Sequence, residues 1–212
     1  NAWDLAGPAY REYLKADPIV RYMGSGHGAS GEDFLVYHEE VPPFTAEEFG
    51  RMQVDYERLN QHLGFFAGFE PYIADAGAEV DLLAAGERLD LIEEYIAFLR
   101  RHYPAVVTSV HHPGVTLPIL ESEGVSFDGY ITPVNKLGVF MLPTPETALT
   151  AIRAARKPVI SIKPMAGGRL LSQEAFDYVL NEVGVAATMF GLGTIDEVCA
   201  TVPRALAALG AA

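Results

Sequence analysis

The later part of the chain, from residue 79 onward, alternates between short apolar runs and longer amphipathic stretches. The apolar runs are rich in β-branched residues and end at polar, proline or glycine positions, which is typical of buried strands. The stretches between them carry apolar residues at helical spacing. This alternation predicts a series of strand–helix units.

Five such units are expected. The strands are predicted at Glu79–Ala84, Val106–His112, Phe127–Val134, Pro158–Lys163 and Ala186–Phe190. The helices that follow them are predicted at Asp90–His102, Leu117–Glu123, Pro145–Arg156, Ser172–Val183 and Ile195–Leu209. Thr144 is expected to cap the third of these helices, with Pro145 at its first position, and Ser172 to cap the fourth. Because Thr147 stands where a capping box has Glu or Gln, that partner is absent.

Strands that are apolar on both faces and alternate with helices indicate a parallel sheet covered by helices, with right-handed crossovers. A closed barrel and an open doubly wound sheet both satisfy this pattern. We favour the barrel, because no Gly-x-Gly-x-x-Gly follows an early strand and polar residues recur at the ends of several strands. The predicted fold class is therefore α/β, a TIM-barrel-like (β/α)8 arrangement.

Residues 1–78 lack this alternation of strands and helices. Tyr22–Gly31 forms a glycine-rich loop, Phe34–Tyr37 is expected to be a short strand, and Ala46–Leu63 to be helical. An eight-stranded barrel usually needs about 250 residues, so we expect one domain over residues 1–212 whose N-terminal half is incomplete or irregular. The missing strands are compressed, lost, or supplied by a second copy or a partner subunit.

The charge balance excludes two classes of partner. Lys plus Arg is 15 and Asp plus Glu is 28, which gives a net charge of -13. Such a chain offers no cationic surface for nucleic acid or for anionic membranes. The single cysteine, Cys199, cannot form an internal disulfide, so we expect a reducing, cytoplasmic location. The chain begins at Asn1 with no leader ahead of it, which leaves open a mature product or a fragment.

A series of short motifs carries a family resemblance. The motifs are His112-Pro113 after a strand, Asp128 and Asn135 at the two ends of the next, Lys163-Pro164 with Gly167-Gly168-Arg169-Leu170, and Gly191-Leu192-Gly193-Thr194 before Asp196-Glu197-Val198. In order and spacing, from about residue 80 to the end, they resemble the second half of an aldo/keto reductase-type barrel. The resemblance implies a barrel enzyme that reduces an aldehyde or ketone with NADPH or NADH.

The same resemblance implies a Tyr, Lys, Asp and His tetrad from the first half of the barrel, which we do not place on residues 1–78. Two further positions depart from the family pattern. Thr108–His112 stands where Gly-x-Ser-x-His is usual, and Ile131 stands where a Gln commonly precedes the Asn. These departures motivate an alternative without nicotinamide.

Lys163 ends an apolar strand, so its ammonium should project toward the mouth of the barrel. Burial there would lower the pKa of the amine and make it a base or a Schiff-base nucleophile, or else Lys163 forms an ion pair or only orients substrate. His111 and His112 occupy successive strand positions and should point to opposite sides, so one is expected to face the cavity as an acid, base or substrate-binding group. No metal is expected, because the histidine spacing matches no ligand signature.

Asn135 is placed to bind a hydroxyl, amide or phosphate, or else it simply adopts a left-handed turn conformation. The cofactor-binding candidates follow the last two strands, where barrels often hold a phosphate, and they are Gly167, Gly168, Arg169, Gly191, Gly193 and Thr194. Tight turns alone would also explain these glycines. Asp196 and Glu197 argue against a phosphate at this site, because they already complement the dipole of the last helix and would repel an anion.

Three hypotheses follow from the sequence. The first is an aldo/keto reductase-like barrel enzyme acting on a small carbonyl or sugar-like substrate, with Lys163, His111 or His112, and Asn135 at the mouth. The second is a nicotinamide-independent lyase or isomerase that uses Lys163. The third is a non-catalytic barrel subunit.

Overall fold

A computed structural model of the chain describes residues 46–210. The chain divides into two compact units, and the boundary falls between Ala105 and Val106. The predicted loop Tyr22–Gly31 and the predicted strand Phe34–Tyr37 lie outside the described residues. The single domain over residues 1–212 and its internal boundary at residue 78 stay predictions.

The described part of the first unit contains four helices and one strand. They are α4 (Ala46–Arg51), α5 (Tyr56–Gly64), β1 (Ile73–Asp75), α6 (Glu79–Ala85) and α7 (Leu89–Leu99). The single helix expected over Ala46–Leu63 is in fact two. Asp55 starts the second, because its carboxylate accepts a hydrogen bond from the Arg58 N–H at 2.9 Å and so caps the new helix.

The predicted strand at Glu79–Ala84 is wrong, because these residues form helix α6. A short apolar run fits a buried helix as well as a buried strand, and periodicity cannot separate the two. Glu, Leu and Ala favour the helix, and the acidic Glu79 and Asp81 lie in its first turn, where they complement the helix dipole. The strand in the described part of this unit is β1, three residues that the sequence pattern did not indicate.

Helix α7 confirms the predicted helix at Asp90–His102, although it ends earlier, at Leu99. It buries one apolar face, made of Leu91, Ile92, Ile96, Phe98 and Leu99. On its exposed side, the Tyr56 hydroxyl of α5 donates to Glu94 at 2.6 Å. These contacts join α5 and α7 within the first unit.

The second unit is built on the parallel strands β2 (Ala105–Ser109), β3 (Gly129–Pro133), β4 (Val159–Ile162) and β5 (Ala187–Thr188). They lie side by side in chain order, and β3 is buried along its whole length, as a central parallel strand should be. Within residues 106–210 no pairing returns from β5 to β2. The predicted α/β class with a parallel sheet is confirmed, and the sheet is open over these residues.

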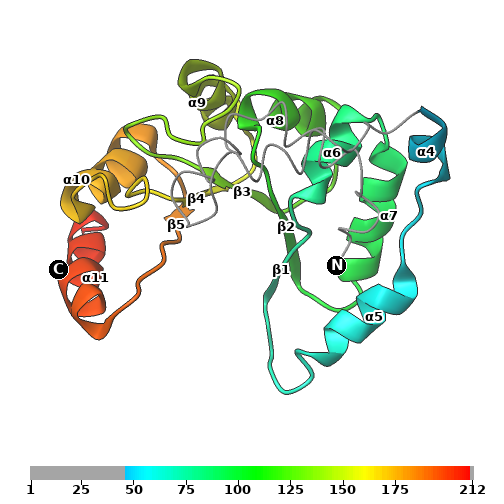
Figure 1. The fold of residues 1–212 in the computed structure, drawn as a ribbon, viewed down its shortest axis with the longest axis horizontal. Helices are drawn as coiled ribbons and strands as arrows, with labels where there is room; N and C mark the ends of the chain where they lie inside the picture. The colour runs from blue at the N-terminus through cyan, green and yellow to red at the C-terminus, as the bar shows by residue number, and fades with distance from the viewer. Residues whose placement is uncertain (1–45, 211–212) are drawn as a thin grey trace, which may run out of the picture. The chain divides into compact units, whose positions relative to one another are not determined.

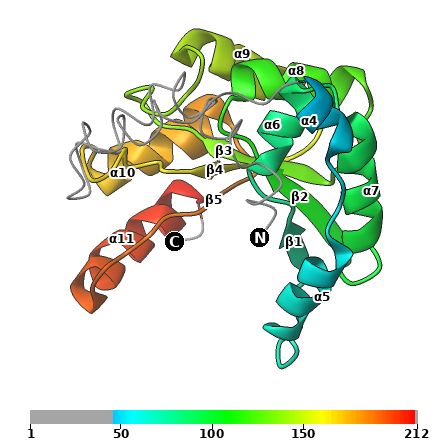
Figure 2. The same cartoon turned by 45° about the vertical axis from the view of Figure 1, so that its right-hand side comes forward.

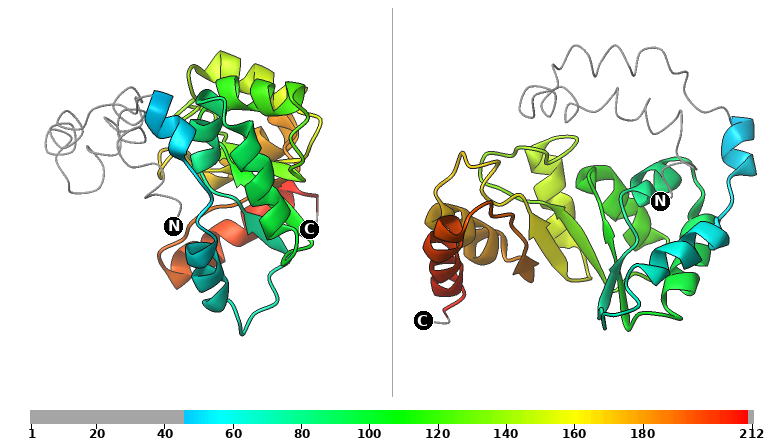
Figure 3. Two further views of the ribbon diagram at one scale, coloured as in Figure 1. Left: turned by 90° about the vertical axis from the view of Figure 1, so that its right-hand side faces the viewer. Right: turned by 60° about the horizontal axis from the view of Figure 1, so that its bottom comes forward.

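A helical segment follows each of the strands β2 to β5. These segments are α8 (Pro113–Ser122), α9 (Pro145–Ala154), α10 (Ser172–Phe176) continued by the π-helix Asp177–Val183, and α11 (Ile195–Ala208). Helices α8 and α9 pack side by side over one face of strands β2 to β4 (Figures 1 and 2). Helices α10 and α11 lie together (Figure 3) and share a small core of Phe176, Ala205 and Ala208.

Two predicted helix starts need correction. Helix α8 begins at Pro113 rather than Leu117, because Pro113 occupies the first helical position, where a proline needs no hydrogen-bond partner, and so starts the helix instead of breaking it. Ser172 is the first residue of α10, not its cap, and its hydroxyl accepts a hydrogen bond from Arg204 of α11 at 2.9 Å. That contact ties α10 to α11.

Helix α9 has the predicted cap. Thr144 Oγ1 accepts from the Thr147 N–H at 3.2 Å, and Thr147 Oγ1 in turn accepts from the Thr144 N–H at 3.3 Å. The hydroxyl of Thr147 thus replaces the missing Glu or Gln, because its oxygen accepts the hydrogen bond from the backbone N–H of the cap residue.

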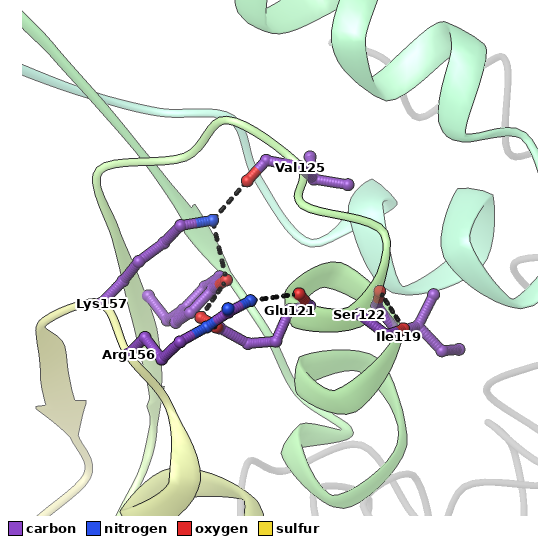
Figure 4. Close-up of polar contacts among 7 residues, drawn as sticks. Ile119, Glu121, Ser122, Val125, Arg156 and Lys157 are labelled. Carbon is purple, nitrogen blue, oxygen red and sulfur yellow. Dashed lines mark hydrogen bonds and ion pairs between the residues drawn. The ribbon is translucent and has the colours of Figure 1, made fainter.

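A polar network ties the helices to the sheet near the amino ends of the strands (Figure 4). The Tyr130 hydroxyl of β3 donates to Glu121 of α8 at 2.9 Å and accepts from Lys157 at 3.3 Å. Arg156 donates to the other Glu121 oxygen at 2.6 Å, and Lys157 also donates to the carbonyl of Val125. These contacts stabilise this end of the unit, which in barrels is the end away from the active site.

Candidate active site at the carboxyl ends of β2, β3 and β4

The carboxyl ends of β2, β3 and β4 meet at one edge of the sheet, because the strands are parallel and in close register. Ser109 pairs with Ile131, and Pro133 pairs with Ile162. The ladder continues one residue past each strand, as the Val110 N–H donates to Ile131 and the Val134 N–H donates to Ile162. The loops that leave these ends therefore surround a common edge.

Lys163 lies directly after β4 at this edge, as predicted. It is partly buried, and its Nζ lies 5.1 Å from the centre of the Phe140 ring. Burial lowers the pKa of Lys163 from its ordinary value. Among the described residues the ammonium has no ion pair.

Both members of this contact have strained backbones. Lys163 has φ +57° and Phe140 has φ +64°, in the left-handed region that non-glycine residues rarely adopt. Each such residue costs about 1–2 kcal/mol relative to the right-handed conformation. Backbone strain of this kind gathers at active sites and ligand clamps.

Asn135 is completely buried, and its side chain closes the loop that leaves β3. Its Nδ2 donates to the carbonyl of Val139 at 2.7 Å, and its Oδ1 accepts from the Val139 N–H at 2.9 Å. Its backbone carbonyl accepts from Gly138 at 3.1 Å. With both ends of its amide used inside the loop, Asn135 is a structural clamp in this conformation, and its predicted role in binding a ligand stays a prediction.

His111 and His112 lie in the loop between β2 and α8 rather than on the strand. The predicted strand at Val106–His112 is too long, because β2 ends at Ser109 and His112 is already the residue that precedes the first turn of α8. The argument that successive strand residues point to opposite sides therefore does not apply to this pair. Both side chains are partly buried at the carboxyl edge, and their role as acid or base stays a prediction.

The six cofactor-binding candidates lie in the loops that leave β4 and β5. Gly167, Gly168 and Arg169 are exposed, and the Arg169 guanidinium donates to the carbonyl of Ala166 at 2.7 Å. Gly191 is exposed and has open space around its Cα.

At the start of α11, Glu197 of the helix itself is already hydrogen-bonded to two of the cofactor-binding candidates, Gly193 and Thr194. The Gly193 N–H donates to the Glu197 carboxylate at 2.6 Å, and the Glu197 N–H donates to Thr194 Oγ1 at 3.2 Å. The carboxylate stands where an anion would bind a helix N-terminus. Cofactor binding by these residues stays a prediction.

Residues 46–210 bear on two other classes of partner, metal ions and membranes. This part of the chain holds no group of three or more His, Cys, Asp or Glu side chains that could coordinate a metal ion. None of its helices combines the length and the apolar composition needed to cross a bilayer. The predictions of no nucleic-acid partner and of a cytoplasmic location stay predictions.

The first unit holds a separate small pocket that the sequence did not indicate. Its lining is mainly apolar and comes from residues 52–55 and from α5, α6 and α7, and it includes the polar residues Arg58, Glu79 and Tyr95. Burial, together with the nearby carboxylates of Glu79 and Asp75, raises the pKa of Tyr95 to about 12. The phenol is therefore neutral at physiological pH.

Sequence reasoning missed Phe140, the residue that contacts Lys163. A weak indication was present, because Asn135 and Gly138 are residues that favour a tight turn. The turn alone does not say that the ring which follows it lies against a lysine of the next strand. That contact is a product of the folded sheet.

The comparisons with known proteins concern the fold. The sequence matches no protein-family model and no curated protein. A solved structure named "Putative aldo-keto reductase" from Pseudomonas aeruginosa superposes with a TM-score of 0.50 at 21% identity, over 80% of this chain and 61% of that chain. Another from the same organism, with the same description, gives a TM-score of 0.47 at 17% identity, over 98% of this chain and 79% of that chain.

The first of these matches shows the fold. The chain has an aldo/keto reductase-like α/β fold, which confirms the predicted resemblance at the level of architecture. It spans about three-fifths of the length of that solved structure. Since unrelated activities share one fold, the activity has to be argued from the site.

Proposed function

We propose that this chain carries the carbonyl-binding site of an aldo/keto reductase-like barrel enzyme that acts on a small carbonyl or sugar-like substrate. The observation that carries the proposal is Lys163 at the carboxyl edge of the sheet, a partly buried ammonium with no acidic partner among residues 46–210. In barrel enzymes this edge is where the active site lies. The aldo/keto reductase-like fold supports the choice of a carbonyl substrate.

Lys163 contacts the carbonyl oxygen and donates a hydrogen bond to it. Partial negative charge grows on that oxygen when the carbonyl carbon is attacked, and a positioned cation in a partly dry site stabilises it. An ammonium already paired with a carboxylate would be less effective, because the acid would compete with the oxygen. His111 and His112, in the neighbouring loop, supply an imidazole for proton transfer.

A nicotinamide cofactor would supply hydride to the carbonyl carbon, and NADPH or NADH is the reductant that the fold suggests. The residues at the start of α11 do not fit its phosphates in this conformation. Glu197 holds the Gly193 N–H at 2.6 Å, and its charge would repel a phosphate. We therefore assign no step of the reaction to the cofactor.

A second function is favoured by the electrostatics of Lys163. Burial lowers its pKa, so a larger fraction of the side chain is the neutral amine, which is the nucleophile in imine formation. The amine nitrogen would add to the carbonyl carbon, and loss of water would give the imine. A lyase or isomerase of this kind needs no nicotinamide.

The experiment that tests the proposal measures the conversion of glyceraldehyde, dihydroxyacetone and glucose by the purified chain. One arm follows oxidation of NADPH or NADH, and the other adds borohydride and looks by mass spectrometry for an adduct on the Lys163 peptide. We expect one arm to be positive and to depend on Lys163. Lys163→Met should lower kcat/KM by roughly 100- to 1,000-fold, as for the loss of one oxyanion donor.

Two further variants separate the functions. Lys163→Arg keeps the positive charge but cannot form an imine, so it retains part of a reductase activity and abolishes borohydride trapping. Lys136→Met is the matched control, because Lys136 is exposed and pairs with Glu174 at 2.9 Å. Equal loss in the Lys136 and Lys163 variants, or no conversion and no adduct with any substrate, would overturn the proposal.

A further inference from the structure

We propose that Asn135 and Phe140 are positioning residues for Lys163: Asn135 closes the loop after β3, and the closed loop holds the Phe140 ring against the Lys163 ammonium. This inference deepens the proposed function and rests on it for the role of Lys163 in the reaction. The geometry itself stands independently of any reaction. It predicts that two uncharged side chains set the properties of the lysine.

The clamp is the first part of the argument. Asn135 bonds to both the N–H and the carbonyl of Val139, at 2.9 and 2.7 Å, so the residue before Phe140 is fixed on two sides. Beyond the ring, the Met141 N–H donates to the Gly138 carbonyl at 3.2 Å, and the Met141 sulfur accepts from the Asn135 N–H at 3.4 Å. Phe140 therefore lies in a loop that is tied on each side of it.

The backbone strain is an independent observation. Phe140 and Lys163, with φ +64° and +57°, are two of the four non-glycine residues with positive φ among the described residues, and they contact each other across two loops. A left-handed non-glycine residue persists only where its surroundings fix it. The Asn135 clamp fixes Phe140 in this way. For Lys163, its carbonyl accepts from the Ala166 N–H at 3.0 Å.

The ring acts on the lysine in two opposite ways. Its volume keeps water away from the ammonium, which favours the neutral amine. Its π face attracts the cation, which favours the charged form. Burial lowers the pKa of Lys163, and no charged side chain among residues 46–210 pairs with it. A change that keeps the volume and removes the π face should therefore reveal the attraction alone.

The experiment follows the pH titration of each lysine by NMR, in the full chain labelled with ¹³C at lysine Cε. The chain has four lysines, and Lys163→Arg assigns the signal of interest. Phe140→Leu should raise the acid dissociation constant of the Lys163 ammonium roughly two- to five-fold, because the cation–π attraction is lost and an apolar wall remains. An unchanged or a smaller dissociation constant would overturn the inference.

Asn135→Ala tests the clamp. We expect the dissociation constant of Lys163 to fall toward that of the exposed Lys136, because the released loop admits water to the ammonium. Leu137→Ala, at a half-exposed position of the same loop, is the control and should change neither value. A Lys163 titration that is the same in Asn135→Ala and wild type would contradict the clamp. Should Asn135→Ala not fold, Phe140→Leu decides the question.

The readout separates this inference from the proposed function. A shifted Lys163 titration in an enzyme without carbonyl chemistry would keep the positioning and refute the function. The opposite result is carbonyl chemistry that depends on Lys163 together with a Lys163 titration that Phe140→Leu leaves unchanged. That result would keep the function and refute the positioning.

Discussion

Removal of the Tyr130 hydroxyl tests how the polar network of Figure 4 stabilises the second unit. Tyr130→Phe deletes the hydrogen bond to Glu121 at 2.9 Å and leaves the buried ring in place. The side chain of Glu121 is 14% exposed, whereas that of its other partner, Arg156, is 73% exposed and well solvated. The tyrosine hydroxyl is thus the less screened of the two donors.

The magnitude follows from the type of bond. Hydrogen bonds to charged groups contribute about 1.5–3 kcal/mol each. Glu121 keeps Arg156 as a partner in the variant, so we expect the lower part of this range, a loss of about 1.5–2 kcal/mol at pH 7. Lys157 keeps its bond to the Val125 carbonyl, so no second buried group is left without a partner.

The effect should depend on pH. Burial alone would raise the pKa of Glu121, but the hydrogen bonds from Arg156 and Tyr130 outweigh it and lower the pKa. A carboxylate with a lowered folded pKa stabilises the fold above its unfolded value and loses that contribution as pH falls through the folded value. The difference between wild type and Tyr130→Phe should therefore shrink once the pH falls through the lowered pKa of Glu121, to the roughly 1 kcal/mol of a bond between neutral groups.

Urea unfolding at pH 7 and at a series of lower pH values measures this difference, provided that the dependence on urea is the same in the two proteins. Tyr178→Phe, in the π-helix after α10, is the control for loss of a partly buried phenol hydroxyl. A difference below about 0.5 kcal/mol at pH 7, the usual scatter of surface substitutions, would refute the reasoning. A difference that stays equal at every pH of the series would refute the role of the Glu121 charge.

Three other predictions follow from single contacts. Gly114→Ala should cost about 1–3 kcal/mol in urea unfolding, because a Cβ there would lie 2.8 Å from both Pro143 and Thr147, and an unchanged midpoint would contradict this close packing. Thr194→Ala should cost about 1 kcal/mol by removing the cap of α11, whereas Thr194→Ser should restore stability. Because the pKa of Tyr95 is raised to about 12, its stabilising contribution is full below its ordinary value and is lost as pH rises through about 12. In an ultraviolet titration, Tyr95→Phe should remove a phenol that ionises late, and removal of an early one would contradict its burial.

The sequence predicted the strands well where a run of β-branched residues was bounded by proline or glycine. The runs around Val106, Phe127 and Pro158 hold β2, β3 and β4, because an apolar run bounded by proline or glycine has few alternatives. It failed at Glu79–Ala84, where the same apolar character belongs to a helix. A buried helix and a buried strand of six or seven residues look alike in composition, and only the packing of the unit decides between them.

The candidate site was predictable in part for a similar reason. A lysine at the end of an apolar strand is visible in the sequence, and the structure places Lys163 at the carboxyl edge. The partner of that lysine was not visible. Phe140 reaches it through a loop closed by Asn135, and the contact depends on residues that are distant in sequence and joined by the register of β3 and β4. Local propensity carries no information on such contacts.

The most direct test of the central claim asks whether a small carbonyl compound reaches Lys163. In the chain labelled at lysine Cε, glyceraldehyde, dihydroxyacetone and glucose are titrated in turn, and the four lysine signals are followed. The account predicts that at least one compound shifts the Lys163 signal in a saturable way and leaves Lys136 and Lys157 unchanged. A Lys163 signal that none of the compounds moves, or a uniform shift of all lysines, would contradict it.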